Sequence, residues 1–195
     1  MNKKNILITG SGPHLPEWWD KNVDKIKDYE VISINTSICI TKERCNRWIK
    51  SEDYYYYHKD LVETLSLLEK KLKPFDKCKG IPIIPVANYD WPFKYKRNGS
   101  GGIMFFNVLE GVINEAFWYN NIKEINIVGC DLIYKSGKIN HFYGKSGTND
   151  PMRMGIRWIE YNLKMFKHAF KLLNIPVYNL SLSEETLLPF PRKIL

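Results

Sequence analysis

A short apolar run near the start of the chain leads into a glycine-rich turn, Asn5-Ile6-Leu7-Ile8-Thr9-Gly10-Ser11-Gly12-Pro13-His14-Leu15. A continuous apolar run of this length is typical of a strand that is buried on both faces of a parallel sheet. The next segment, from Pro16 to Lys27, predicts a crossover helix with a proline near its start. Glu30 to Asn35 predicts a second buried strand. Together these elements make a βαβ unit, which indicates an α/β protein.

Strand and helix patterns continue to alternate along the rest of the chain. Further strands are expected at 47–49, with 54–57 as an ambiguous extension, and at 81–86, 124–129 and 176–180. Helices are expected at 61–72, from Gly102 to Phe117 and at 156–173. Residues 88–98 are expected to form an exposed loop. No internal repeat or linker interrupts this order. We therefore expect one Rossmann-like domain over residues 1–195, with a mainly parallel open sheet and helices on both of its faces.

Composition and charge exclude several classes of protein. The hydrophobic fraction of 44% and the charged fraction of 26% are those of a globular protein rather than a disordered one. The first apolar run is too short for the core of a signal peptide, and no run approaches the roughly 20 residues that span a bilayer. We therefore expect a cytoplasmic protein with no transmembrane segment.

The net charge of +8 favours acidic ligands in general, or is simply that of a solvated basic surface.

The four cysteines, Cys39, Cys45, Cys78 and Cys130, form no C-x-x-C pair and have no histidine at zinc spacing. We expect reduced, mostly buried thiols and no metal site.

Polar and glycine residues follow the predicted strands, and a further group, Ser100-Gly101-Gly102, lies at the start of the helix expected from Gly102. In parallel α/β sheets ligands bind outside the carboxyl ends of the strands, so these residues are the candidates for a nucleotide site. They are Gly10, Ser11, Gly12, Pro13, Asn35, Thr36, Ser100, Gly101, Gly102, Asp131 and Ser181. Each has a structural alternative. The first loop either lets a phosphate approach the backbone or is a tight turn, Ser100 is a ligand or a helix cap, and Asp131 binds a sugar hydroxyl or caps a turn.

Histidine is scarce in this chain, and His141 stands in a polar loop beside the phenol of Tyr143. A titrating imidazole in such a loop can act as a general acid or base, and otherwise is a surface histidine.

Taken together, Gly10 to Leu15, Asn35, Ser100-Gly101-Gly102 and Val128-Gly129-Cys130-Asp131-Leu132 resemble the lipooligosaccharide-type bacterial sialyltransferases that use CMP-sialic acid. The resemblance implies donor-binding roles for Asn35, Ser100, Gly101, Asp131 and Tyr134. The segment His141-Phe142-Tyr143-Gly144 is similar to one in phage-encoded proteins that share this signature, and archaeal pterin pyrophosphokinases of a related fold also resemble the chain.

Three functions follow from these patterns and from the resemblance. The first is transfer of a sugar, without a metal ion, from a nucleotide sugar to a hydroxyl of a glycan or of modified DNA. The resemblance implies that CMP is the nucleotide. His141 would be the base, and Tyr134 or Tyr143 would stabilise the leaving phosphate. The nucleotide sugar is a substrate, and no other cofactor is expected. The second is pyrophosphoryl transfer from ATP, which needs Mg²⁺ held by carboxylates such as Asp131 and Asp150. The third is a phage or viral protein that binds a nucleotide without turnover, or that binds or modifies DNA. Association into a homo-oligomer is compatible with each.

Overall fold

The computed structural model describes residues 3–51, 76–78, 96–97, 100–101, 108–116, 121–133, 141 and 156–195. Its main sheet has six parallel strands in the order β4-β3-β2-β1-β7-β8. The strands are β1 (Lys4–Thr9), β2 (Tyr29–Ile34), β3 (Cys45–Ser51), β4 (Asp76–Cys78), β7 (Ile122–Val128) and β8 (Val177–Asn179). The predicted α/β class and its parallel sheet are confirmed.

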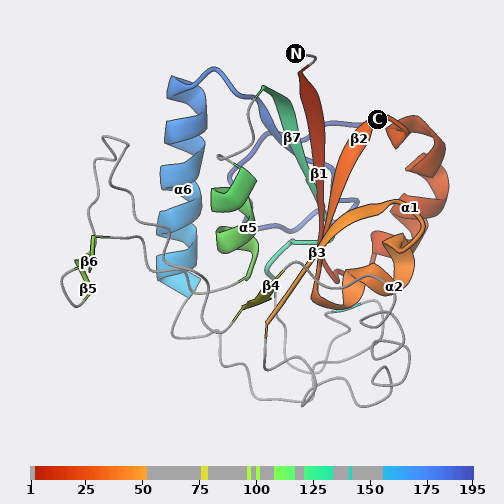
Figure 1. Cartoon of the computed structure of the whole chain (residues 1–195), viewed down its shortest axis with the longest axis horizontal. Coiled ribbons are helices and arrows are strands. Elements are labelled where there is room, and N and C mark those ends of the chain that lie inside the picture. Colours follow the sequence, from red (N-terminus) through yellow and green to blue (C-terminus); the bar gives the residue numbers. More distant parts are fainter. Residues whose placement is uncertain are drawn as a thin grey trace.

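Helices cover both faces of this sheet, as Figure 1 shows. On one side lie α1 and α2, with the short 3-10 helices η1 and η2, and on the other side lie α5 and α6. Their bounds are α1 (Leu15–Asn22), η1 (Val23–Ile26), η2 (Asn35–Ser37), α2 (Ile38–Thr41), α5 (Val108–Ala116) and α6 (Ile156–Leu172). The helix expected at Pro16 to Lys27 is therefore α1 followed by η1.

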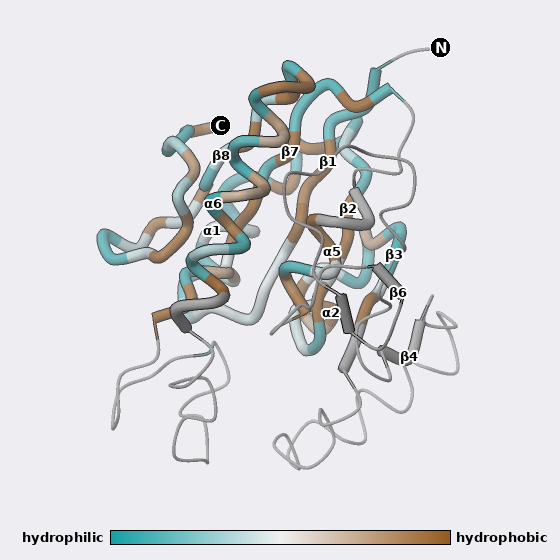
Figure 2. The backbone as a smooth tube through the Cα atoms, turned by 90° about the vertical axis from the view of Figure 1, so that its left-hand side faces the viewer, coloured by the Kyte–Doolittle hydropathy of each residue, from teal (hydrophilic) through white to brown (hydrophobic). Residues whose placement is uncertain are grey.

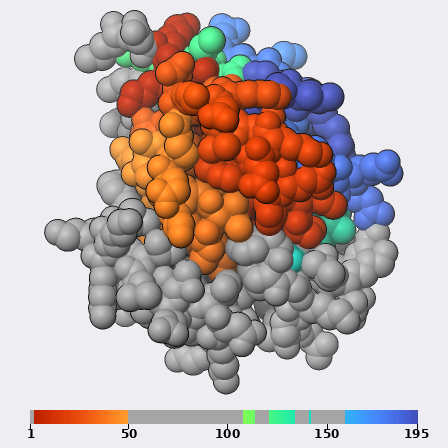
Figure 3. Space-filling model, turned by 90° about the vertical axis from the view of Figure 1, so that its right-hand side faces the viewer, coloured from red at the N-terminus to blue at the C-terminus, as the bar shows by residue number. Residues whose placement is uncertain are grey.

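Two buried clusters, one on each face, hold these layers together. Alternate residues of β1 point to opposite faces, so Ile6 and Ile8 pack with α5 and α6 while Leu7 packs with Trp18 and Trp19 of α1. Figure 2 shows the result, with apolar strands inside and a regular alternation of apolar and polar residues along α6. In Figure 3, α1 lies between the segment that carries α2 and β3 and the C-terminal segment of the chain.

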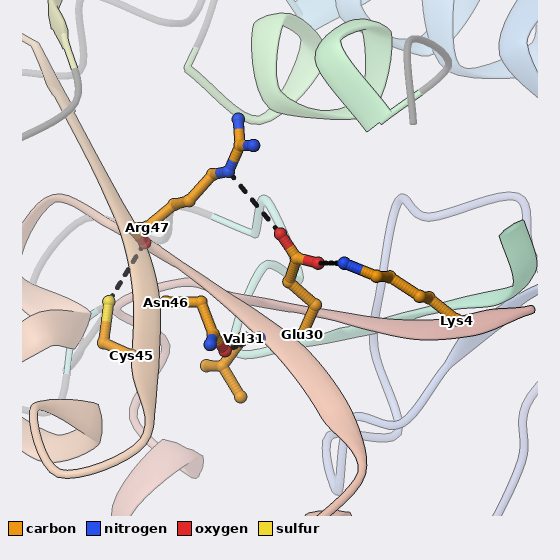
Figure 4. A network of polar contacts seen from close by, with 6 residues as sticks. All are labelled: Lys4, Glu30, Val31, Cys45, Asn46 and Arg47. Carbon is orange, nitrogen blue, oxygen red and sulfur yellow. Dashed lines mark hydrogen bonds and ion pairs between the residues drawn. The ribbon is translucent and has the colours of Figure 1, made fainter. Parts of the chain in front are cut away.

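A polar cluster ties β1, β2 and β3 together near the start of β2 (Figure 4). The Glu30 carboxylate lies 2.8 Å from Lys4 Nζ and 3.5 Å from Arg47 Nε. The pairing of β2 with β3 shifts register between Val31 and Ile32, and Asn46 Oδ1 accepts the Val31 N–H at 2.8 Å. The amide side chain thus satisfies a donor that the bulge would otherwise leave unpaired.

Several sequence expectations need correction or lie outside the described residues. Lys96–Arg97 (β5), expected in a loop, pairs antiparallel with Ser100–Gly101 (β6). Ser100 and Gly101 are therefore extended and do not start a helix, and the described part of the next helix begins at Val108. The elements expected at 54–57, 61–72 and 81–86 lie outside the described residues. Within the described part of the chain, no helix combines the length and hydrophobicity needed to cross a lipid bilayer.

Candidate functional site at the carboxyl edge between β1 and β7

The strand order reverses beside β1. The chain passes from β1 outward through β2 and β3 to β4, and later resumes on the other side of β1 with β7 and then β8. Neighbouring loops diverge at such a switch point, and open α/β sheets bind their ligands there. The loops that follow β1 and β7 therefore form the first place to look for a site.

Three glycines bring these two loops into backbone contact. A Cβ on Gly12 would lie 2.8 Å from Gly129 O, and a Cβ on Gly129 would lie 2.5 Å from Gly10 O. Gly129 also has a φ of +69°, which favours glycine. Gly10 N–H donates to Val128 O at 2.8 Å and Gly12 N–H donates to Gly129 O at 2.7 Å. Glycine is needed here because one loop packs on the other.

This packing determines which backbone donors the first loop can offer a phosphate. The N–H groups of Gly10 and Gly12 are engaged with the β7 loop, and Leu15 N–H donates to Gly12 O at 3.1 Å. Pro13 and Pro16 have no N–H. The turn is therefore left with the amides of Ser11 and of His14, the N-cap of α1, for an anionic ligand.

Hydroxyl groups join the ends of β1 and β2. Ser11 Oγ lies 2.6 Å from Thr36 Oγ1, and Thr36 is fully buried. In a second contact between these strand ends, Thr9 Oγ1 lies 3.1 Å from Ser37 Oγ. The Ser37 hydroxyl also donates to Ile34 O at 2.8 Å. These contacts hold the loops after β1 and β2 at a fixed spacing.

Asn35 begins the turn after β2 with a φ of 48°, in the left-handed region. Asparagine adopts this conformation more readily than most residues. Its backbone O accepts the indole N–H of Trp48 at 2.8 Å, which ties the turn to β3.

Asp131 is the buried acid of the site. It lies in the loop after β7, between two residues with positive φ, Gly129 at 69° and Leu132 at 60°. Such a φ is unusual for a bulky residue such as leucine and costs free energy, on the order of 1 kcal/mol. Only 8% of Asp131 is exposed, and its Oδ1 is buried without a hydrogen-bond partner among the described residues. The loop thus holds an unsatisfied acceptor at the switch point.

The C-terminal segment, residues 181–195, closes over this acid. Leu187 N–H donates to Asp131 O at 2.9 Å. Burial raises the pKa of Asp131, and this effect is opposed by hydrogen bonding from Ser181, attraction from His14, hydrogen bonding from Thr186 and attraction from Arg192. Arg192 is itself fixed by the backbone O atoms of Ser183 and Glu184.

The predicted site residues therefore divide into three groups. Those at the carboxyl ends of β1, β2, β7 and β8 lie at one edge of the sheet, and these are Gly10, Ser11, Gly12, Pro13, Asn35, Thr36, Asp131 and Ser181. Ser100 and Gly101 belong to the separate β5–β6 pair, which Figure 1 places away from this edge, beyond α6. Gly102, Tyr134 and Tyr143 lie outside the described residues, and His141 is described as half-buried.

Sequence reasoning missed Thr186 and Arg192. Both lie in a segment without apolar periodicity, so no element was expected there. A usable signal was the run of hydroxyl residues Ser181, Ser183 and Thr186 directly after the last predicted strand, since that strand ends at the same edge.

Metal-binding side chains do not gather in threes anywhere in the described part of the chain. Asp150, the second carboxylate considered for Mg²⁺, lies outside it. Three free cysteines are described, of which Cys130 is buried while Cys39 and Cys45 are half-buried. Burial, followed by the nearby charge of Asp131, raises the pKa of the Cys130 thiol.

Comparison of the chain with models of protein families, with curated proteins and with solved structures finds no match.

Proposed function

We propose that this chain binds a nucleotide sugar at the carboxyl edge between β1 and β7 and transfers the sugar to a hydroxyl acceptor without a metal ion. The observation that carries the proposal is the buried, unpartnered Oδ1 of Asp131 at the switch point of the sheet. An unsatisfied buried acceptor costs about 1–3 kcal/mol, and a ligand hydroxyl that donates to it removes this cost. A ribose or a sugar supplies such hydroxyls.

The neighbouring groups suit the rest of a nucleotide. The His14 amide lies at the N-cap of α1, where the helix dipole favours negative charge, and the Ser11 amide lies in the loop before it. The hydroxyl of Ser11, which contacts the buried Thr36, adds a polar group on the β2 side. Support for sugar transfer, and for CMP as the nucleotide, comes from the sequence resemblance to the sialyltransferases.

In the proposed reaction His141 takes the proton of the acceptor hydroxyl as that oxygen bonds to the anomeric carbon of the sugar. The bond between this carbon and the phosphate oxygen breaks, and the nucleotide leaves with the electron pair. Tyr134 or Tyr143 would donate a hydrogen bond to the departing phosphate.

Thermal unfolding in the presence of CMP, UDP, GDP and ATP, the last with and without Mg²⁺, tests the binding step. We expect CMP to raise the unfolding temperature, because a ligand that binds only the native state stabilises it. Asp131→Asn should weaken CMP binding by about tenfold, because a neutral amide oxygen accepts a weaker hydrogen bond than a carboxylate does. Asp28→Asn, at an exposed aspartate before β2, is the matched control and should bind normally. Binding of ATP and Mg²⁺ without CMP would instead favour pyrophosphoryl transfer.

His141→Ala separates binding from chemistry. We expect this variant to bind CMP like the unmodified chain and to lose transfer of sugar from the CMP-linked donor. Retained turnover would remove His141 from the mechanism.

A further inference from the structure

The side of α6 that faces away from the sheet carries a row of lysines. Lys164, Lys167 and Lys171 are all exposed, while the buried residues of this helix pack into the core on its other side. Residues three, four and seven positions apart lie on the same side of a helix. The three ammonium groups therefore follow one line along about 10 Å of helix. His168, also exposed, lies among them.

These lysines differ from those of α1, where charge is neutralised locally. Lys21 Nζ lies 2.7 Å from the carboxylate of Glu17, one turn earlier in the same helix. Within the part of the chain that the structure describes, the side chains of Lys164, Lys167 and Lys171 form no ion pair or hydrogen bond. The positive charge of the α6 row is therefore left facing solvent.

The sequence of α6 explains why its lysines have no local partner. Its one acid is Glu160, which is half-buried and precedes the row, and the residues one turn before Lys167 and Lys171 are not acidic. Like charges at this spacing repel each other and weaken a helix. The helix dipole offsets this repulsion only in the last turn, at Lys171. An anion bound from outside would relieve it along the whole row.

The surface fits the phosphate backbone of a nucleic acid better than it fits a membrane. A helix that lies in a membrane inserts an apolar face, and the apolar face of α6 is buried in the core. The exposed Tyr161 and Leu172 are about three turns apart and make no inserting face. Segments that bind anionic lipids by charge alone usually carry a cluster of about four to eight basic residues.

A line of cations on a rigid helix instead suits the regularly spaced phosphates of a nucleic acid. The β5–β6 pair lies beyond α6 on the same side of the sheet (Figure 1), and the sequence of β5 is Lys96-Arg97. This side of the molecule therefore carries basic sequence on two separate elements.

We propose that Lys164, Lys167 and Lys171 form a nucleic-acid-binding surface, on which their ammonium groups contact backbone phosphates. Phosphate contacts position a protein on a nucleic acid without reading its bases, so duplexes of different sequence should bind equally well. The surface lies on α6 and not on the loops after β1 and β7, and its role does not rest on the proposed function.

The test is binding of the full chain to a short, fluorescently labelled DNA duplex of mixed sequence over a series of salt concentrations. The logarithm of the binding constant falls linearly with the logarithm of the salt concentration, and each phosphate contact contributes about one to the slope. The triple variant Lys164→Gln, Lys167→Gln and Lys171→Gln, called the α6 variant, should therefore lower the slope by about two to three. Glutamine removes the charge and keeps the helix propensity of lysine.

The matched control removes three charges from the other face of the sheet. Lys21, Lys27 and Lys42 are exposed on the side of α1 and α2, and the ion pairs of the first two are solvent-exposed and contribute little to stability. Lys21→Gln, Lys27→Gln and Lys42→Gln together give the same net charge as the α6 variant and should keep the slope of the unmodified chain. Equal losses in the two triple variants would mean that net charge alone attracts DNA, and would overturn the proposal. An unchanged slope in the α6 variant would overturn it as well.

An amide NMR titration of the unmodified chain with the same duplex decides the question if the α6 variant does not fold. Shift changes that are largest over residues 164–171 support the proposal. Changes centred on another surface, or no binding of the duplex, contradict it. Vesicles of phosphatidylserine and phosphatidylcholine provide the comparison with a membrane. Binding to these vesicles without binding to the duplex would overturn the proposal in favour of a lipid surface.

Discussion

Gly12 lies so close to the backbone of Gly129 that no side chain fits between them. A Cβ on Gly12 would meet Gly129 O at 2.8 Å and Gly129 Cα at 2.9 Å, and both are backbone atoms that cannot rotate away. We expect Gly12→Ala to lower the free energy of unfolding by roughly 1–3 kcal/mol, the cost typical of overpacking.

Urea unfolding measures this change, with Ser11→Ala as the control. That variant alters the same loop but only removes the hydroxyl that contacts Thr36, which should cost about 1 kcal/mol or less. If Gly12→Ala is no less stable than Ser11→Ala, the two loops do not pack as closely as described.

The same residue shows where sequence reasoning was incomplete. The glycines after β1 could be recognised from the pattern, and so could Asp131 after β7. Their mutual contact could not, because it depends on which strand lies next to β1, and Gly12 and Gly129 are far apart in the chain. The glycines were expected to admit a phosphate, and the structure adds a packing reason for them.

Among the larger elements, the C-terminal segment 181–195 belongs to the core although it contains no helix or long strand. Leu188 and Phe190 are each 5% exposed and pack in the cluster on the α5 and α6 side of the sheet. Asn179 N–H donates to Pro191 O at 2.9 Å, and Lys193 Nζ lies 2.6 Å from Glu124 Oε1. The segment is thus fixed along its length beside β8.

We expect Phe190→Ala to lower the free energy of unfolding by about 3–5 kcal/mol, as for other buried aromatic residues cut back to alanine. Urea unfolding of this variant should be compared with Ile194→Ala, whose side chain is 97% exposed and should cost little. Similar stability of the two variants would mean that the segment does not pack as described.

Elements were predictable where hydrophobicity carried the signal. Continuous apolar runs revealed β1, β2 and β7, and the three- and four-residue spacing of apolar residues revealed α6, because burial imposes these patterns. Strand β4 has the short, polar sequence Asp76-Lys77-Cys78, so its pairing with β3 produces no apolar run in the sequence. The C-terminal segment, with Pro189 and Pro191 between its buried residues, has no period at all.

At the scale of the whole molecule, the parallel sheet is what assembles the candidate site. The strands β1, β2, β7 and β8 all end at one edge, so residues far apart in the sequence meet there. This geometry explains why most of the expected residues gather although no single motif was decisive. The same reasoning does not apply to Ser100 and Gly101, because they follow no strand of the main sheet.

The measurement that tests the central claim most directly is an amide NMR titration of the nitrogen-15-labelled chain with CMP. If the site lies at the carboxyl edge between β1 and β7, the largest shift changes will fall on the loops after these strands, at Ser11, His14 and Asp131, and on Thr186 of the C-terminal segment. In Asp131→Asn the same changes will need about tenfold more CMP. Saturable changes centred on another surface, or unchanged CMP binding in Asp131→Asn, would contradict the claim.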